Sequence, residues 1–103
     1  MDDGRTPPHP HPGSVPLQQV LEALVDPVRR GIVATLIESD VDVKCGGFGM
    51  SVSKSTATHH FKVLREAGLI RQYYVGTSRM NTLRSEEVEA AFPGLLGIVE
   101  RDG

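Results

Sequence analysis

The 103-residue sequence has one cysteine and no long apolar run. The single cysteine, Cys45, excludes an intrachain disulfide framework and a CxxC-type zinc site. The longest apolar run, 94–99, is too short to cross a membrane, and the N-terminus lacks the basic and apolar segments of a secretory signal. These absences predict a protein of the cytoplasm that has no membrane partner.

Proline is concentrated at the N-terminus, where five of the seven prolines lie within the first sixteen residues. Such a stretch supports neither a helix nor a strand ladder. We therefore expect a disordered, proline-rich tail over residues 1–13 and one folded domain over residues 14–103. The HPHP run at 9–12 contains two histidines, which are too few to hold a metal ion alone. A domain of this size has a thin core and often completes its burial in an oligomer.

The net charge of −2 hides an uneven distribution. Residues 44–84 contain seven lysines and arginines and one acid, Glu66, which gives this segment a formal charge of +6. The rest of the chain carries −8. A basic segment within an otherwise acidic chain is a signature of a surface that binds a polyanion.

Apolar spacing predicts two helices ahead of the basic segment. Ser14 can cap the first helix, over 15–25. Asp26 and Pro27 supply the cap and the first position of the second helix, over 27–38. The apolar face of the first helix has the spacing i, i+3, i+4, i+7 and consists of Leu17, Val20, Leu21 and Leu24.

The most regular helix is expected over 54–67, capped by Ser53 and closed by Gly68. Three glycines within 45–50 allow at most a short helix or a turn ahead of it. Its inner row is Ala57, Phe61, Leu64 and Ala67. The opposite face carries bases, small hydroxyl groups and a histidine, and it contains Lys54, Ser55, Thr58, His59, Lys62 and Arg65.

Two strand-like runs follow, over 69–75 and 79–83, and a short Gly-Thr-Ser loop joins them into a hairpin. A helix begun by Ser85 and a last apolar helix complete the chain. This order predicts a mainly α fold with a small β-hairpin, the winged helix-turn-helix. Its polar-faced helix is slim enough to enter the major groove of DNA, which is about 12 Å wide. The hairpin loop, with Arg79 beside it, would then lie along the DNA backbone or reach the minor groove.

Two segments resemble the ArsR family of bacterial winged-helix repressors: DPVRR at 26–30 and KSTATHHFKVLREAGL at 54–69. The segment FPGLL at 92–96 is similar to the C-terminal part of one actinobacterial subset, and the whole resemblance covers about 16–99. It implies a homodimer that binds a partly palindromic operator in double-stranded DNA. The implied base contacts are Lys54, Ser55, Thr56, Thr58 and His59, and the implied phosphate contacts are Lys62 and Arg65.

The resemblance also implies that the first and last helices form the dimer interface. The apolar residues that these helices would contribute are Leu17, Val20, Leu21, Leu24, Leu95, Leu96 and Val99. Such an interface would bury apolar stripes that a thin domain leaves exposed.

The chain departs from the family pattern in its sensing residues. Metal-responsive members carry a Cys-x-Cys pair before the recognition helix, or Asp/His and His/Glu pairs on the last helix. Here Cys45 stands alone, and the last helices contain glutamates but no histidine. Zinc prefers imidazole or thiolate ligands. We therefore expect no metal site and no cofactor, and a member of the subset that does not sense metals, with a small organic molecule as its effector if it has one.

Several alternatives remain open at this point. Cys45 is either a small buried hydrophobe or the sensor of a redox-responsive repressor. His59 and His60 point about 100° apart on a helix, so one would face DNA and the other the core or the wing. Protonation of the histidine at the DNA face would add positive charge there, which offers a pH switch. A winged-helix module for protein contact or for RNA would need exposed aromatic residues on helix 54–67, and this helix has none because Phe61 lies on its inner row. An enzyme with Cys45 as nucleophile lacks an orienting third group, so we expect no catalysis.

Overall fold

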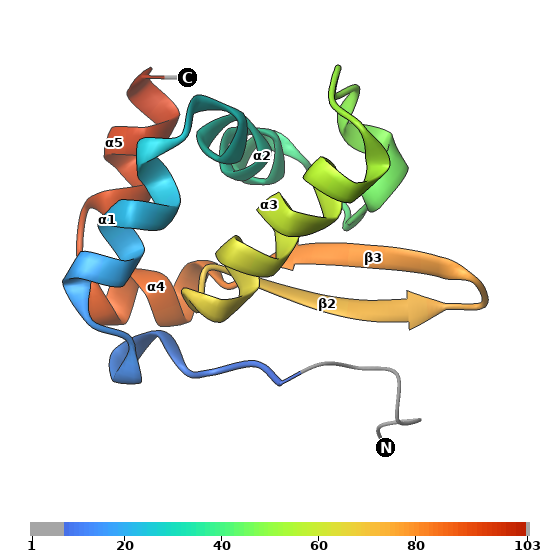
Figure 1. Cartoon of the computed structure of the whole chain (residues 1–103). Coiled ribbons are helices and arrows are strands. Elements are labelled where there is room, and N and C mark those ends of the chain that lie inside the picture. Colours follow the sequence, from blue (N-terminus) through green and yellow to red (C-terminus); the bar gives the residue numbers. More distant parts are fainter. Residues whose placement is uncertain (1–7, 103) are drawn as a thin grey trace.

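The structure, a computed structural model, describes residues 8–102 (Figure 1). The helices are α1 (Leu17–Val25), α2 (Pro27–Glu38), α3 (Lys54–Glu66), α4 (Ser85–Ala91) and α5 (Leu95–Asp102). The strands are β1 (Val43–Lys44), β2 (Ile70–Val75) and β3 (Ser78–Leu83), and two 3₁₀ turns are η1 (Pro12–Ser14) and η2 (Cys45–Phe48). The element order is that of the predicted winged helix-turn-helix.

The junction between α1 and α2 forms as the sequence predicts. The Asp26 carboxylate accepts hydrogen bonds from the backbone N–H groups of Val28 (2.7 Å) and Arg29 (3.3 Å), and Pro27 occupies the first helical position. Desolvation opposes ionisation of Asp26, but the two N–H groups and nearby positive charge together outweigh it and lower the pKa of this carboxyl. The start of α1 differs from the prediction, because the Ser14 hydroxyl donates to the His11 carbonyl instead of capping the helix.

Helix α3 begins and ends where its flanking residues predict. Ser53 Oγ accepts from the backbone N–H of Thr56 at 3.2 Å. Gly68 adopts a φ of 79°, a left-handed conformation that residues with a Cβ rarely adopt. In that conformation its N–H donates to the Arg65 carbonyl, and the next N–H, that of Leu69, donates to the Leu64 carbonyl. These bonds satisfy the last carbonyl groups of the helix.

The sheet has three antiparallel strands in the order β1-β3-β2, one more than the hairpin expected from the sequence. The pairing of Val75 with Ser78 leaves Gly76 and Thr77 as the hairpin turn. The additional strand, β1, contributes two residues, Val43 and Lys44, which pair with Asn81 and Met80. Two residues are too few for an alternating pattern to emerge in a sequence.

A single apolar core joins the helices to the sheet. In Figure 1, α1 and α5 lie at one end of the molecule, and the β2–β3 hairpin projects from the opposite end beyond α3. The core residues are Val20, Ala23, Leu24, Ile32, Val33, Leu36, Phe61, Leu64, Ala67, Leu69, Ile70, Val88 and Val99, with Val15 at its edge. The core fixes the position of α3 relative to the hairpin.

The N-terminal segment packs against the domain from residue 8 onward. Arg84 Nη1 donates to the Pro10 carbonyl at 2.7 Å, and the Gln72 N–H, on the edge strand β2, donates to His9 Nε2 at 2.9 Å. Pro12 is fully buried and lies so close to Gly68 that a Cβ there would be 2.9 Å from the Pro12 Cα. The prediction of a disordered tail is therefore wrong for residues 8–13, because the folded domain supplies hydrogen-bond partners to it. Residues 1–7 lie outside the described part of the chain.

Candidate DNA-binding surface

The outer face of α3 is exposed along its N-terminal two turns. The side chains that the sequence predicts to contact bases all lie on this surface: Lys54, Ser55, Thr56, Thr58 and His59. Thr58 Oγ1 donates to the Lys54 carbonyl at 2.9 Å, which leaves the lone pairs of this hydroxyl available to a donor. Lys62 follows on the same exposed face. This half of α3 presents cations and hydroxyl groups without a carboxylate.

Arg65 differs from its predicted role. Its side chain is 8% exposed, and its Nη1 donates to Gln72 Oε1 at 2.8 Å. Burial, and secondarily the charge of Arg79, lowers the pKa of this guanidinium. The prediction of a phosphate contact is therefore wrong for Arg65, because this helix position faces β2 rather than solvent.

Gln72 and Asn81 form a buried polar pair beneath α3 that the sequence analysis missed. Both are fully buried, and Gln72 Nε2 donates to Asn81 Oδ1 at 2.9 Å. Asn81 Nδ2 donates in turn to the Val43 carbonyl (3.1 Å) and to Cys45 Sγ (3.3 Å). Polar residues at facing positions of two strands are a signal for such a pair. The network holds the sheet against η2 and gives half-buried Cys45 a structural contact.

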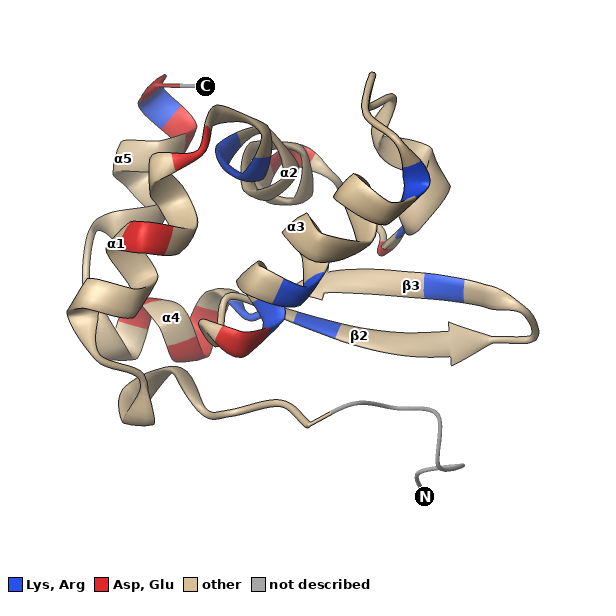
Figure 2. Cartoon of the chain, viewed as in Figure 1, with Lys and Arg blue, Asp and Glu red and all other residues tan. Residues whose placement is uncertain are grey.

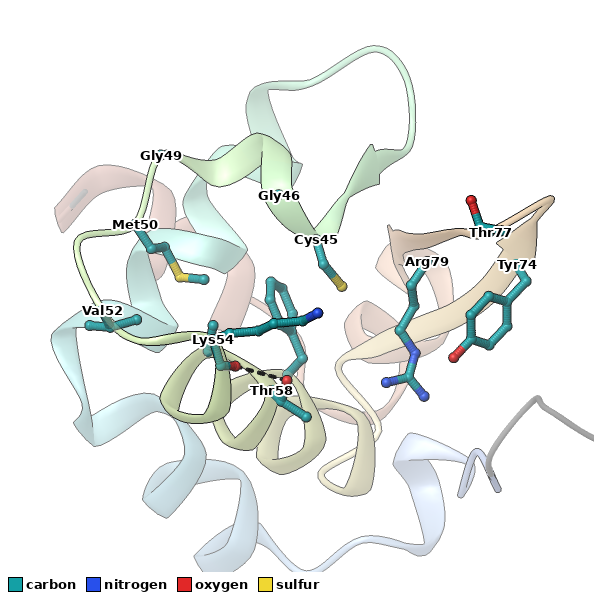
Figure 3. Close-up of a pocket in the computed structure, with 12 residues that line it drawn as sticks. Cys45, Gly46, Gly49, Met50, Val52, Lys54, Thr58, Tyr74, Thr77 and Arg79 are labelled. Carbon is teal, nitrogen blue, oxygen red and sulfur yellow. Dashed lines mark hydrogen bonds between the residues drawn. The ribbon is translucent and has the colours of Figure 1, made fainter.

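The hairpin places Arg79 and Tyr74 on the same side as the N-terminal half of α3 (Figure 3). The Arg79 guanidinium carbon lies 5.4 Å from the centre of the Tyr74 ring, a cation–π distance. Arg79 Nε is buried and has no hydrogen-bond partner among the described residues. The ring therefore holds this guanidinium in place without neutralising its charge.

Charge is distributed unevenly over the elements (Figure 2). The hairpin strands carry only basic charges, Arg71 and Arg79, whereas α4 and α5 together hold five acidic residues and one arginine. A polyanion that approaches α3 and the hairpin strands therefore meets charges that are mostly positive.

The two adjacent histidines divide as the sequence predicts. His59 is exposed on the outer face of α3, and His60 is buried. Arg29 Nη1 lies 3.1 Å from His60 Nδ1. Because a guanidinium only donates hydrogen bonds, His60 Nδ1 is the acceptor in this contact.

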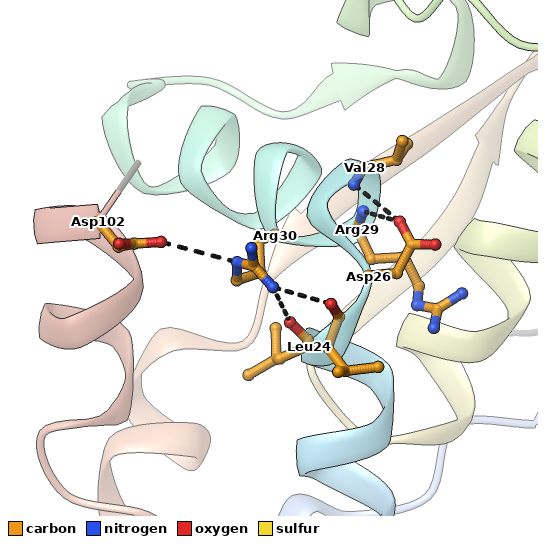
Figure 4. A network of polar contacts seen from close by, with 7 residues as sticks. Leu24, Asp26, Val28, Arg29, Arg30 and Asp102 are labelled. Carbon is orange, nitrogen blue, oxygen red and sulfur yellow. Dashed lines mark hydrogen bonds and ion pairs between the residues drawn. The ribbon is translucent and has the colours of Figure 1, made fainter.

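The two arginines of the DPVRR segment close the C-terminal end of α1 (Figure 4). Arg29 Nε donates to the Ala23 carbonyl at 2.7 Å. Arg30 Nη1 donates to the Leu24 and Val25 carbonyls at 2.7 and 3.0 Å. Arg30 also lies 3.8 Å from the Asp102 carboxylate on α5. These bonds satisfy carbonyl groups that the helix end leaves free.

The predicted interface residues separate into two groups. Val20, Leu24 and Val99 lie in the core of the single chain, so the prediction that they form an interface is wrong, and Leu95 and Leu96 are half-buried. The apolar residues that remain exposed on α1 and α5 are Leu17 (55%), Leu21 (48%), Val25 (71%) and Ile98 (55%). Val25 and Ile98 are absent from the sequence-based set, because the helical pattern alone does not separate core positions from exposed ones.

Residues 8–102 contain no cluster of metal-ligating side chains and no helix suited to a membrane. No group of three or more His, Cys, Asp or Glu side chains in this part of the chain could hold a metal ion. Within the same residues, every helix is too short or too polar to span a bilayer.

An exposed basic helix beside a basic hairpin, on this fold, defines a winged helix-turn-helix DNA-binding protein. Residues 26–72 match the family described as "Bacterial regulatory protein, arsR family". The chain is 36% identical over 80 residues to an uncharacterised HTH-type transcriptional regulator, YceK of Bacillus subtilis, with 76% of this chain and 80% of that protein covered. The chain therefore belongs to the ArsR family of bacterial transcriptional regulators, as its resemblance predicts.

Two solved structures have the same fold. Reduced HlyU from Vibrio cholerae has a TM-score of 0.65 at 23% identity and covers 82% of this chain and 84% of its own. The transcriptional repressor BigR from Xylella fastidiosa has a TM-score of 0.59 at 22% identity and covers 73% of this chain and 78% of its own.

Proposed function

We propose that this transcriptional regulator is a repressor that binds a partly palindromic operator as a homodimer, in the bacterial cytoplasm. The observation that carries the proposal is the exposed, carboxylate-free N-terminal half of α3, with the Arg79 hairpin beside it. A helix with such a face fits the major groove, where lysine and hydroxyl side chains can pair with base edges. That the structurally similar BigR is named a transcriptional repressor supports the direction of regulation.

The contacts divide by the position of each side chain. Lys54, Ser55, Thr56, Thr58 and His59 lie at the N-terminal end of α3 and read the bases. Lys62, further along the exposed face, and Arg79, on the hairpin, pair with phosphates, which position the protein without carrying sequence information. Arg65 takes no part, because it is buried against β2.

The homodimer forms through α1 and α5. Their exposed apolar residues (Leu17, Leu21, Val25 and Ile98) lie at the end of the molecule that faces away from the hairpin (Figure 1). Leu17, Leu21 and Val25 recur every four residues along one face of α1, and a row of exposed apolar side chains on a small domain marks a contact surface. A two-fold axis through this end would place two copies of α3 on successive turns of one face of DNA.

Binding to the DNA upstream of the gene tests the proposal. Fluorescence anisotropy of a labelled upstream duplex is expected to give tight, sequence-selective binding that weakens as salt rises. Zinc, a chelator, peroxide and a thiol reductant are added in separate experiments, and we expect none of them to release the DNA. Release by peroxide would instead make Cys45 the sensor of a redox-responsive repressor. The absence of selective binding would favour a module for protein contact.

A further inference from the structure

A pocket of about 560 Å³ lies between η2, the N-terminal half of α3 and the β2–β3 hairpin (Figure 3). This volume falls within the range of small-molecule sites, which is about 300–1,000 Å³. The pocket opens on the same side of the molecule as the proposed base-reading residues, and Lys54 and Thr58 belong to both. Its occupancy would therefore affect DNA binding directly.

One wall of the pocket is apolar. It is formed by Cys45, Met50, Val52, Ala57 and Phe61. Phe61 is 2% exposed and stacks at 5.4 Å, in a tilted arrangement, on the ring of Phe48. Figure 3 shows the Met50 and Cys45 sulfur atoms directed toward the interior of the pocket. Apolar side chains make no favourable contact with a DNA phosphate. They can pack against the carbon skeleton of an organic molecule.

The opposite side of the pocket is polar and positive. Lys54 reaches in from α3, and Arg79 approaches from β3 with its guanidinium against Tyr74 (Figure 3). None of the residues that line the pocket is acidic. Within residues 8–102, neither Lys54 nor Arg79 forms a salt bridge, and Arg79 Nε lacks a hydrogen-bond partner. Two uncompensated cations at one end of an apolar cavity are complementary to an amphiphilic anion.

We propose that this pocket binds a small organic anion with an apolar, aromatic body, and that this anion releases the DNA. The body lies against Met50 and Phe61, and the anionic group pairs with Arg79 and Lys54. This inference rests on the proposed function, because Lys54 and Arg79 are also proposed DNA contacts. One pair of cations cannot serve both partners, so the ligand and the operator exclude each other, and each lowers the affinity for the other equally.

The test uses 8-anilinonaphthalene-1-sulfonate, a fluorescent aromatic anion, on the full chain. We expect saturable binding with one site per chain, and release of the operator as this site fills. N-phenyl-1-naphthylamine, which has the same ring system without the sulfonate, is expected to bind about tenfold more weakly. Arg79→Gln is expected to weaken binding of the sulfonate about tenfold and to leave binding of the neutral compound unchanged. Equal binding of the two probes would overturn the proposal.

Filling the pocket gives the decisive variant. Ala57→Leu places a larger side chain in the apolar wall, outside the proposed DNA contacts. It is expected to abolish probe binding and probe-induced release while it keeps operator binding. Ala90→Leu, on the exposed surface of α4, is the matched control and should retain both. If Ala57→Leu does not fold, Gly46→Leu replaces it, because a Cβ there meets no atom within 4 Å. If a variant with the larger side chain folds and still binds the probe as the wild type does, the proposal that the probe occupies this pocket is overturned.

Operator binding without the probe is measured first, so the two proposals fail separately. If the proposed function is wrong, the wild type will show no selective DNA binding, with or without the probe. If only the proposed ligand site is wrong, the wild type will bind the operator and the probe will not release it.

Discussion

Arg29 donates a hydrogen bond from Nη1 to Nδ1 of buried His60 at 3.1 Å, and so links the start of α2 to the recognition helix. The same guanidinium donates from Nε to the Ala23 carbonyl and from Nη2 to the Glu22 carbonyl at the end of α1. One side chain thus connects three helices. The orientation of α3, on which base reading depends, is set in part by this arginine.

Replacement of Arg29 by alanine is expected to reduce the free energy of unfolding by about 1–3 kcal/mol, because buried His60 loses its partner and helix-end carbonyls lose their donors. Urea unfolding followed by circular dichroism measures this change. Arg101→Ala, which removes an exposed arginine on α5, should change the free energy by less than about 0.5 kcal/mol. Equal effects of the two substitutions would contradict the role of Arg29.

Packing of the N-terminal segment is expected to depend on pH through His9. Burial, together with the charges of Arg65, Arg84, Arg71 and Arg79, lowers the pKa of this imidazole. Its neutral form accepts from the Gln72 N–H, so a proton on Nε2 removes that bond. In the unfolded chain this imidazole takes up its proton as the pH falls below about 6.5, the ordinary pKa of histidine. In the folded chain it takes up the proton only at a lower pH.

The stability contributed by His9 is therefore present above its unfolded pKa and is lost as the pH falls through its folded pKa. The difference in unfolding free energy between the wild type and His9→Gln should shrink from pH 7.5 to pH 5. Ser51→Ala, at an exposed residue without a titratable side chain, is the control and should give a difference without this trend. If the difference in unfolding free energy for His9→Gln does not change with pH, the hydrogen bond between His9 and Gln72 does not contribute to stability as proposed.

Base reading by α3 is tested with Lys54→Ala and His59→Ala. Each is expected to weaken operator binding by about 1–3 kcal/mol, as the loss of a good base contact does. Binding to a scrambled duplex should change much less. Equal losses on both duplexes would make these side chains phosphate contacts.

Arg79 and Arg65 are expected to behave differently although both lie in the basic segment. Arg79→Ala should weaken binding to all duplexes similarly and lower the slope of log K against log salt by about 1, since one phosphate contact is lost. Arg65→Met should leave the slope unchanged and lower the stability, because Arg65 bonds Gln72 inside the protein. A reduced salt slope for Arg65→Met would show that Arg65 contacts a DNA phosphate.

The dimer surface is tested with Leu21→Asp and Ile98→Asp, which place a charge among the exposed apolar residues of α1 and α5. Both variants should sediment as monomers and lose operator affinity, because burial of an unpaired carboxylate is unfavourable. Val41→Asp is the matched control, since Val41 is apolar and 73% exposed but lies outside these helices. Unshifted sedimentation of both interface variants would contradict the proposed surface.

Local signals predicted most of the fold. Asp26 and Pro27 begin α2 as expected, and Ser53 and Gly68 bound α3, because capping depends on a few neighbouring residues. The exposed face of α3 followed from helical periodicity at most of its positions.

Features that depend on distant residues were not predictable in the same way. The burial of Arg65 depends on Gln72, and the packing of residues 8–13 depends on Arg84 and on the free edge of β2. Periodicity identified the apolar faces of α1 and α5. It did not show which of their residues are buried within the single chain and which remain exposed. That division required the packing of α2 against α5, as at Arg30 and Asp102.

The proposed dimer reads a two-fold symmetric operator through the α3 helices of its two chains. Its most direct test compares binding of the wild type to its upstream duplex and to a duplex in which one half-site is scrambled, at several salt concentrations. We expect two chains on the intact duplex and a large, sequence-dependent loss of affinity on the altered one, with affinity falling steeply as salt rises. Equal affinity for both duplexes, or one chain per duplex, would contradict this mode of binding.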